Sequence, residues 1–248
     1  MRRLAFLTVA LALLAGAVHG QANATAVLDK AIAAAGGEAK LAKLQGLTLK
    51  GKGNYHEAGK PDIPFASTWY TQGNDKGRTI NELEAMGAKS YEVRVINGDK
   101  GWVKDGKLEA RVMDKDDLAD ERENLYFNWV TTLAPLKGKD FKLTAAEDAK
   151  VDGKAAAAFS VSSKGHRDIK LYFDKESGLL VKSERKVRDS SANKDVVEEV
   201  YFSNFKDADG IKIAMKYSVK WDGQPQADVE MTEAKAQEKL DDKLFQKP

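Results

Sequence analysis

Cysteine is absent from this chain of 248 residues. Without a thiol the protein cannot contain a disulfide scaffold, a thiolate zinc site or a cysteine nucleophile, and it cannot carry a lipid on an N-terminal cysteine. Histidine is nearly as scarce: there are three, of which only His56 and His166 lie beyond the first twenty positions. A metal site would have to draw most of its ligands from carboxylates, so we expect no metal and no cofactor.

Charge of one sign does not dominate the sequence. Hydrophobic residues make up 42% of the chain and charged residues 31%, which excludes a multi-span membrane protein and general disorder. The 40 Lys and Arg residues include Arg2 and Arg3; without these two, 38 remain, which equals the 38 Asp and Glu residues. The rest of the chain is therefore formally neutral, which gives no electrostatic reason to expect binding to nucleic acid.

The N-terminus has the pattern of a secretory signal. Arg2 and Arg3 precede an apolar run from Leu4 to Val18, which is short for a membrane-spanning helix. We expect a signal peptide over residues 1–20 that is cleaved near Gly20, and an uncleaved N-terminal anchor is the alternative. An exported chain with no cysteine for a lipid anchor is expected in the periplasm or outside the cell.

Helical patterns occur in three places. Residues 24–35 place alanines and Val27 on one side and end at Gly36-Gly37, in the manner of a C-terminal glycine. Residues 38–44 predict a second short helix. Residues 114–133 predict a longer one, because they begin with several aspartates and then repeat Leu and Trp at helical spacing.

Elsewhere the apolar residues alternate with a period of two, which is typical of half-buried strands. The clearest case is residues 211–221, where six apolar residues alternate with four polar ones and an alanine. Together with dipeptides typical of hairpin turns, these runs predict about ten antiparallel strands joined consecutively as a meander. The strand runs include residues 47–55, 91–96, 159–162, 169–174, 179–187, 196–205 and 227–235, and the turns are Asn97-Gly98, Asp105-Gly106, Asp152-Gly153, Ser177-Gly178, Asp209-Gly210 and Asp222-Gly223.

A helix in the middle of an open sheet must bury its apolar face, and the nearest apolar surface is the sheet itself. We therefore predict an α+β fold, in which a strongly curved antiparallel sheet forms an incomplete β-barrel and helices cover its concave face. Neither a linker nor a repeat divides the sequence after the signal. Residues 21–248 are expected to form a single domain.

Motifs that would indicate catalysis are incomplete. The segments Gly46–Lys52 and Gly101–Lys107 have the glycine-lysine spacing of a phosphate loop, but each lacks the following Ser or Thr and the following helix. His56-Glu57 lacks the second histidine of a zinc hydrolase, because Lys60 stands there. His166 could be the base of a catalytic triad, but the sequence contains no Gly-x-Ser-x-Gly elbow that would supply the nucleophile. The sequence predicts a protein that is not an enzyme, and a hydrolase is the least favoured function.

Aromatic, leucine and methionine side chains are spread over the expected strands and the middle helix. Such residues are ordinary core components. If the sheet and the helix do not close completely, however, the space between them is an apolar pocket suited to acyl chains. The candidate ligand-binding residues for such a cavity are Trp69, Tyr91, Trp102, Leu125, Trp129, Phe173, Met215 and Tyr217.

The two ends of the sequence resemble the LolA-like outer-membrane lipoprotein-sorting superfamily. The resemblance lies in Ala35-Gly36-Gly37, in Leu41 and Leu44 followed by the strand Leu47–Gly51, and in the segments Tyr201–Phe205, Asp209–Lys212, Trp221–Gly223 and Leu240–Pro248. It implies an incomplete β-barrel lidded by helices, with a hydrophobic cavity for acyl chains.

The function that this resemblance implies is a non-catalytic periplasmic carrier. Such a monomeric protein would bind a lipid or a lipid-modified protein in its cavity, as a transport factor or chaperone in outer-membrane lipoprotein sorting, with peripheral membrane contact. The alternative is an envelope sensor or protein-interaction module, which uses the same fold to bind a protein partner, as similar domains in envelope-stress regulators do.

Overall fold

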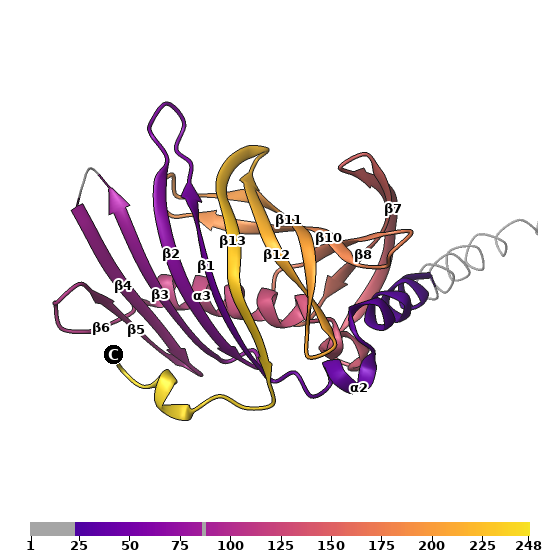
Figure 1. The fold of residues 1–248 in the computed structure, drawn as a ribbon, viewed down its shortest axis with the longest axis horizontal. Helices are drawn as coiled ribbons and strands as arrows, with labels where there is room; N and C mark the ends of the chain where they lie inside the picture. Colours follow the sequence, from indigo (N-terminus) through magenta and orange to yellow (C-terminus); the bar gives the residue numbers. More distant parts are fainter. Residues whose placement is uncertain (1–22, 86–87) are drawn as a thin grey trace, which may run out of the picture.

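The computed structural model describes residues 23–85 and 88–248 (Figure 1). The predicted signal peptide, residues 1–20, lies outside the described residues. No helix in the described ranges is long and apolar enough to cross a membrane.

In the described part of the chain, thirteen strands form one antiparallel sheet, whose order is β6-β5-β4-β3-β2-β1-β13-β12-β11-β10-β9-β8-β7. The sheet is strongly curved and does not close into a barrel (Figure 1). The strands are β1 (Gly46–Tyr55), β2 (Ile63–Gln72), β3 (Lys76–Ala85), β4 (Ala88–Asn97), β5 (Lys100–Asp105), β6 (Arg111–Val112), β7 (Lys142–Val151), β8 (Lys154–Ser162), β9 (Ile169–Asp174), β10 (Leu180–Asp189), β11 (Lys194–Ala208), β12 (Ile211–Trp221) and β13 (Gln224–Gln237).

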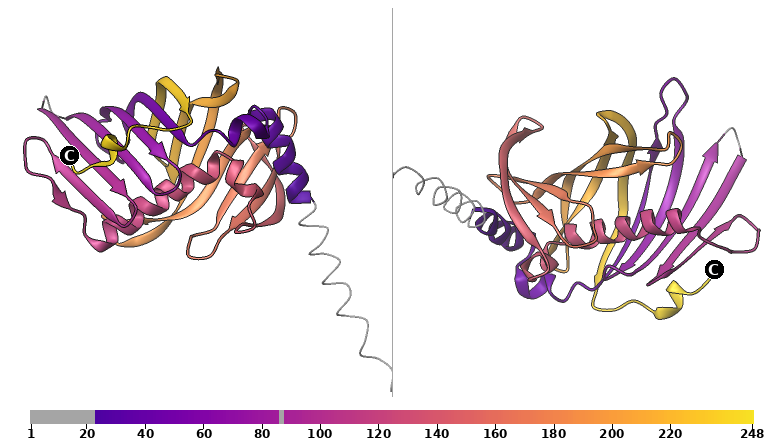
Figure 2. Two further views of the ribbon diagram at one scale, coloured as in Figure 1. Left: turned by 90° about the horizontal axis from the view of Figure 1, so that it is seen from below. Right: turned by 180° about the vertical axis from the view of Figure 1, so that it is seen from behind.

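The principal helix is α3 (Lys115–Thr131), which connects the two edge strands, β6 and β7. To do so it crosses the concave side of the sheet (Figure 2). Its N-terminus is capped by the Asp114 side chain, which accepts hydrogen bonds from the backbone N–H groups of Asp116 and Asp117. A glycine in β3 allows the close approach, since a Cβ at Gly77 would lie 2.5 Å from Cδ2 of Leu125.

The smaller helices lie at the ends of the sheet. A helix over residues 23–35 and the short α2 (Glu38–Leu41) precede β1, and the 3₁₀ turn η1 (Ala134–Lys137) follows α3. A second 3₁₀ turn, η2 (Asp242–Phe245), follows β13. The predicted second helix, residues 38–44, was too long, because the backbone leaves the helix after Leu41 and continues as a turn.

The predicted fold class is confirmed: a curved antiparallel sheet that stays open carries helices on its concave side. Strand β12 coincides with the predicted run 211–221. Each predicted hairpin dipeptide connects two consecutive strands, and its glycine has a positive φ, between 56° and 80° in this set. Glycine adopts this conformation without the steric cost that a Cβ would add.

The predicted strand order was wrong in one respect. The chain forms two meanders, β1 to β6 and β7 to β13, and the first strand pairs with the last, with Leu49 opposite Ala234. This β1–β13 seam lies in the middle of the sheet. The prediction failed because alternation of apolar residues shows that a strand exists, but not which strand it pairs with.

The main hydrophobic core lies under the β7–β12 half of the sheet. There the helix over residues 23–35 and α3 pack against the concave face, and Phe159 stacks on Phe173 with ring centroids 5.1 Å apart. Tyr126 of α3 is also fully buried in this cluster. Side chains of the two helices and of β8 and β9 therefore pack closely here.

In the β2–β5 half of the sheet, a second hydrophobic core lies on the convex face. The segment after β13 packs Leu240 and Phe245 against Val93 and Val95 of β4. Polar bonds hold the same segment, since Asn97 Nδ2 donates to the Phe245 carbonyl at 3.3 Å. A further cluster lies on the concave side at β4 and β5, where Ile96 and Val103 pack with Met113 and with Leu118 and Leu125 of α3.

Candidate functional site

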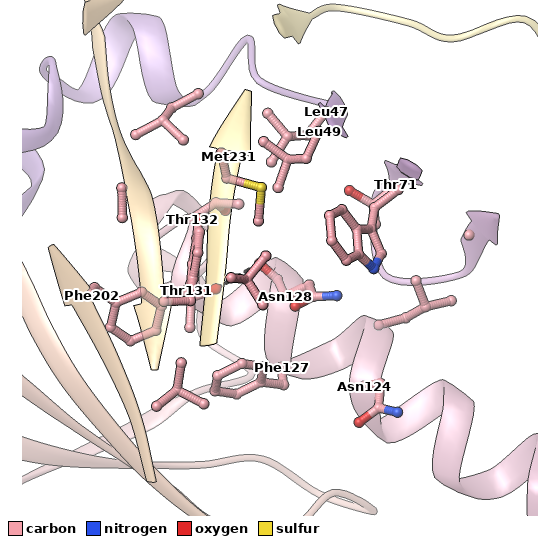
Figure 3. Close-up of a pocket in the computed structure, with 18 of the residues that line it drawn as sticks. Leu47, Leu49, Thr71, Asn124, Phe127, Asn128, Thr131, Thr132, Phe202 and Met231 are labelled. Atoms are coloured by element: carbon pink, nitrogen blue, oxygen red, sulfur yellow. Dashed lines mark hydrogen bonds between the residues drawn. The ribbon is translucent and has the colours of Figure 1, made fainter. Parts of the chain in front are cut away.

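A cavity of about 510 Å³ lies between the concave face of the sheet and α3 (Figure 3). Strands β1–β4 and β10–β13 contribute residues to it, as do α2 and α3. Several of its lining residues, among them Phe127, Phe202 and Ile213, also belong to the main hydrophobic core.

One wall of the cavity is apolar. Leu47 and Leu49 of β1 and Met231 of β13 face it near the β1–β13 seam (Figure 3). The wall continues across β11, β12 and β13 with Val200, Phe202, Phe205, Ile211, Ile213, Ala214, Tyr217, Val219 and Val229. This lining can remove the hydrocarbon part of a ligand from water.

Helix α3 lines the cavity with apolar Leu125 and Phe127 and with a set of polar residues. The polar residues Glu121, Asn124, Asn128 and Thr131 line the cavity from successive turns of the helix, and Thr132 follows it. Figure 3 labels the last four of these. Residues three or four apart share one face of a helix, so these side chains form a stripe. The helical spacing of these polar residues was a signal in the sequence, but the prediction for this segment rested on its initial aspartates and its apolar face.

Arg94 of β4 forms the first of two ion-pair groups in the cavity. Its Nε donates to Glu92 Oε1 at 2.8 Å, and its Nη1 donates to Glu121 Oε1 of α3 at 3.1 Å. The hydrogen bonds to Glu92 raise the pKa of Arg94, while burial raises the pKa of Glu121. These bonds connect the sheet to α3 at this end of the cavity.

Arg185 of β10 forms the second group and is more deeply buried. Its side chain is 9% exposed and that of Glu198 is 12% exposed, and the two are joined by a 2.8 Å bond from Nε to Oε1. The guanidinium also donates to the Glu123 carbonyl at 3.2 Å and to Asn124 Oδ1 at 2.8 Å. Arg185 therefore fastens β10 and β11 to α3.

Three of the eight predicted ligand-binding residues line this cavity, namely Trp69, Leu125 and Tyr217. They come from β2, α3 and β12, so the structure brings them together from distant parts of the sequence. Contact of these residues with a ligand remains a prediction.

The other five residues lie elsewhere. Trp129 packs against Phe141 at 5.6 Å between ring centroids, and Phe173 belongs to the main core. Met215 is buried outside the cavity lining. Trp102 packs on the convex face beneath the C-terminal segment, because its position in the alternation of β5 turns it away from the concave side.

Tyr91, the last of the eight, lines a second hollow of about 800 Å³ at the other end of β1–β4. Tyr55 and Phe65 stack near it, with ring centroids 4.3 Å apart. Phe65 and Val229 line this second hollow, and Val229 also lines the main cavity. By the alternation of the strands, most of the other residues that line the hollow, among them Lys52, Glu82 and Tyr91, face the convex side.

At the edge of the second hollow, His56 bridges two carboxylates. Its Nδ1 lies 2.9 Å from Asp62 Oδ1 and its Nε2 lies 3.2 Å from Asp228 Oδ2, while Asp228 also accepts a hydrogen bond from Ser218. The bond to Asp62 is the main cause of a raised His56 pKa, with a further contribution from Asp228. The charged imidazolium is therefore favoured in the folded state.

We expect His56→Gln to destabilise the protein in a pH-dependent manner. A raised folded-state pKa gives a contribution that is complete below the ordinary value of 6.5 and is lost as the pH rises through the folded-state value. The loss should reach about 1 kcal/mol near pH 5.5 and become small near pH 9, because the pair is partly exposed. Urea unfolding of both proteins at the two pH values measures it, and an equal loss at both would contradict the role of the charge.

Within the described residues, no group of three or more His, Asp or Glu side chains comes together in a way that could hold a metal ion. His166 lies 2.8 Å from Glu123 and stacks on Tyr126, with ring centroids 3.7 Å apart. Both His56 and His166 therefore have structural partners.

No protein-family model matches the sequence, and no curated protein matches it either. Solved structures do match the fold. A LolA superfamily protein from Nitrosomonas europaea aligns with a TM-score of 0.58 at 10% identity, covering 90% of this chain and 97% of that one. A DUF1329 family protein from Desulfovibrio piger aligns with a TM-score of 0.57 at 13% identity, with the same coverage.

A third match is a domain from Vibrio parahaemolyticus named as an outer membrane lipoprotein-sorting protein. Its TM-score is 0.55 at 10% identity, and the alignment covers 89% of this chain and 97% of that domain. At such low identities the likeness establishes the fold alone. The chain has a LolA-like fold, as the resemblance in its sequence implied.

Proposed function

We propose that this protein is a non-catalytic carrier that binds a lipid, or the acyl chains of a lipid-modified protein, in the cavity under α3. The observation that carries this proposal is the cavity itself, about 510 Å³ with one continuous apolar wall. Burial of a methylene group is worth about 0.8 kcal/mol, so a hydrocarbon chain gains affinity from every carbon that reaches this wall.

The fold supports the same function. The LolA-like fold is shared with a domain named for lipoprotein sorting. Together with the export signal expected over residues 1–20, this supports a role in the periplasm or outside the cell, in transport of lipids or lipoproteins.

The direct test uses an apolar fluorescent dye and the purified protein without its signal. We expect the dye to become brighter on binding and a fatty acid to displace it. Mass spectrometry of an organic extract of the freshly purified protein should also recover a lipid. Absence of dye uptake together with a lipid-free extract would remove the carrier function, and capture of a specific protein by that lipid-free material would favour the sensor alternative.

A variant in the apolar wall tests whether the dye reports on this cavity. Leu49→Asp places a carboxylate beside the hydrocarbon of the ligand, where burying a charge is costly, so the affinity for dye and lipid should fall by about tenfold or more. The measurement is a dye titration on folded protein, checked by circular dichroism.

The matched control is Val197→Asp. Val197 is an exposed apolar residue of β11 that does not line the cavity, and it receives the same acidic side chain on a strand. Its dye affinity should equal that of the unmodified protein. Equal affinities of both variants and the unmodified protein would place the dye outside the cavity.

A further inference from the structure

The polarity of the cavity changes along one row of residues across the sheet. Leu49 of β1 lies opposite Trp69 of β2, Trp69 lies opposite Thr79 of β3, and Thr79 lies opposite Arg94 of β4. All four line the cavity. One end is therefore apolar and the other polar, which is the arrangement that an amphipathic ligand requires.

The charges at the polar end are already paired. Arg94 is held by two carboxylates, those of Glu92 and Glu121. Arg185 makes three hydrogen bonds, and its partner Glu198 also accepts one from Trp221 Nε1 at 3.3 Å. Neither guanidinium is available to an anionic ligand without breaking an existing ion pair.

The remaining cationic lining residues are directed elsewhere. Arg78 Nη1 donates to the Leu244 carbonyl at 3.2 Å, in the C-terminal segment that packs on the convex face. Lys212 lies 3.5 Å from Asp207. Among the described residues that line the cavity, every Lys and Arg side chain therefore has a protein partner.

Uncharged hydrogen-bonding groups, by contrast, are free at the polar end. The side chains of Thr79 and Asn128 form no hydrogen bond to another described residue, and Asn81 uses only its Oδ1, which accepts from Ser67 at 2.5 Å. A hydroxyl can donate and accept, and an amide offers both groups as well. These side chains can satisfy an ester, an amide or an alcohol.

Given the carrier function proposed above, we infer that the cavity selects amphipathic ligands whose polar group is uncharged. The polar group sits between β3, β4 and α3, and the hydrocarbon extends along β11–β13. An ionised group would be buried here beside cations that already donate to carboxylates or to a backbone carbonyl, which is costly, whereas a neutral group exchanges its hydrogen bonds with water for bonds to Thr and Asn side chains.

Three ligands with the same hydrocarbon chain test this inference by displacement of the dye at neutral pH. These are monolaurin, which is uncharged, lauric acid, which is anionic, and dodecylamine, which is cationic. Monolaurin should bind about tenfold more tightly than either charged ligand, because only the charged ones lose hydration without a partner. Equal binding of all three, or tighter binding of a charged one, overturns the inference and leaves the carrier function standing; binding of none removes the carrier function itself.

The variant Glu121→Gln changes the charge without changing the shape. It removes one of the two carboxylates that pair with Arg94, so the guanidinium can interact with the carboxylate of lauric acid. The affinity for lauric acid relative to monolaurin should therefore rise by about fivefold. The control is Glu123→Gln on the same helix, since Glu123 bonds to His166 and Arg167 outside the cavity lining. An unchanged preference in Glu121→Gln, or the same change in the control, overturns the inference; if the variant does not fold, the ligand series on the unmodified protein decides.

Discussion

Arg185→Ala should lower the free energy of unfolding by about 3–5 kcal/mol, the range seen when one member of a buried ion pair is removed. The variant leaves the Glu198 carboxylate, which is 12% exposed, with only the Trp221 indole as a partner. It also removes the bonds to α3 and the guanidinium that lies 4.1 Å from the centroid of the Phe127 ring. Urea unfolding measures the loss.

A double variant separates the unpaired charge from the lost packing. Arg185→Met with Glu198→Leu removes both charges and keeps similar volumes, and such replacements are often neutral or stabilising. We expect it to be more stable than Arg185→Ala. A loss of less than about 1 kcal/mol in Arg185→Ala would show that the pair does not hold α3 to the sheet.

Gly53→Ala should have the second large effect, a loss of about 3 kcal/mol in the free energy of unfolding. A Cβ at this position would lie 1.9 Å from the Asp228 carbonyl oxygen and 3.1 Å from Cζ of Phe65. The carbonyl belongs to the backbone of β13, so it cannot turn aside as a side chain would. Gly53 therefore permits the close approach of β1 and β13 at the seam.

The control for this variant is Lys52→Ala in the same strand. Lys52 is exposed, so its truncation should change the free energy of unfolding by about 0.5 kcal/mol or less. Thermal and urea unfolding of the two variants give the comparison. If Gly53→Ala lowers the free energy of unfolding no more than the control does, β1 and β13 can move apart at Gly53 without loss of stability. The close approach at Gly53 would then not contribute to stability.

The strands that sequence patterns identified best are those whose concave side is apolar, whether it faces the main core or the cavity. In β12, the alternation is regular because Ile211, Ile213, Tyr217 and their neighbours face apolar partners. Strand β3 gave no such pattern. It presents Gly77, Thr79 and Asn81 to the cavity, so its concave positions are not selected for apolar packing. A strand that borders a polar space carries a weak signal for this reason.

The candidate site was predictable in kind more than in detail. The sequence raised the hypothesis that helix and sheet do not close completely, and Trp69, Leu125 and Tyr217 do line the space between them. It did not indicate which aromatic residues face that space, because the face of a strand depends on register. Nor did it place Arg185 or Arg94, whose partners come from other strands and from α3.

The β1–β13 seam has a consequence for how the protein acquires its structure. The two strands that meet in the middle of the sheet are far apart in the sequence, so this pairing has a high contact order and cannot form until β13 has been synthesised. Until then, each meander exposes a bare central edge on which another copy could add a strand. Slow closure of the seam would make the newly synthesised chain vulnerable to aggregation and dependent on dilution or assisted folding.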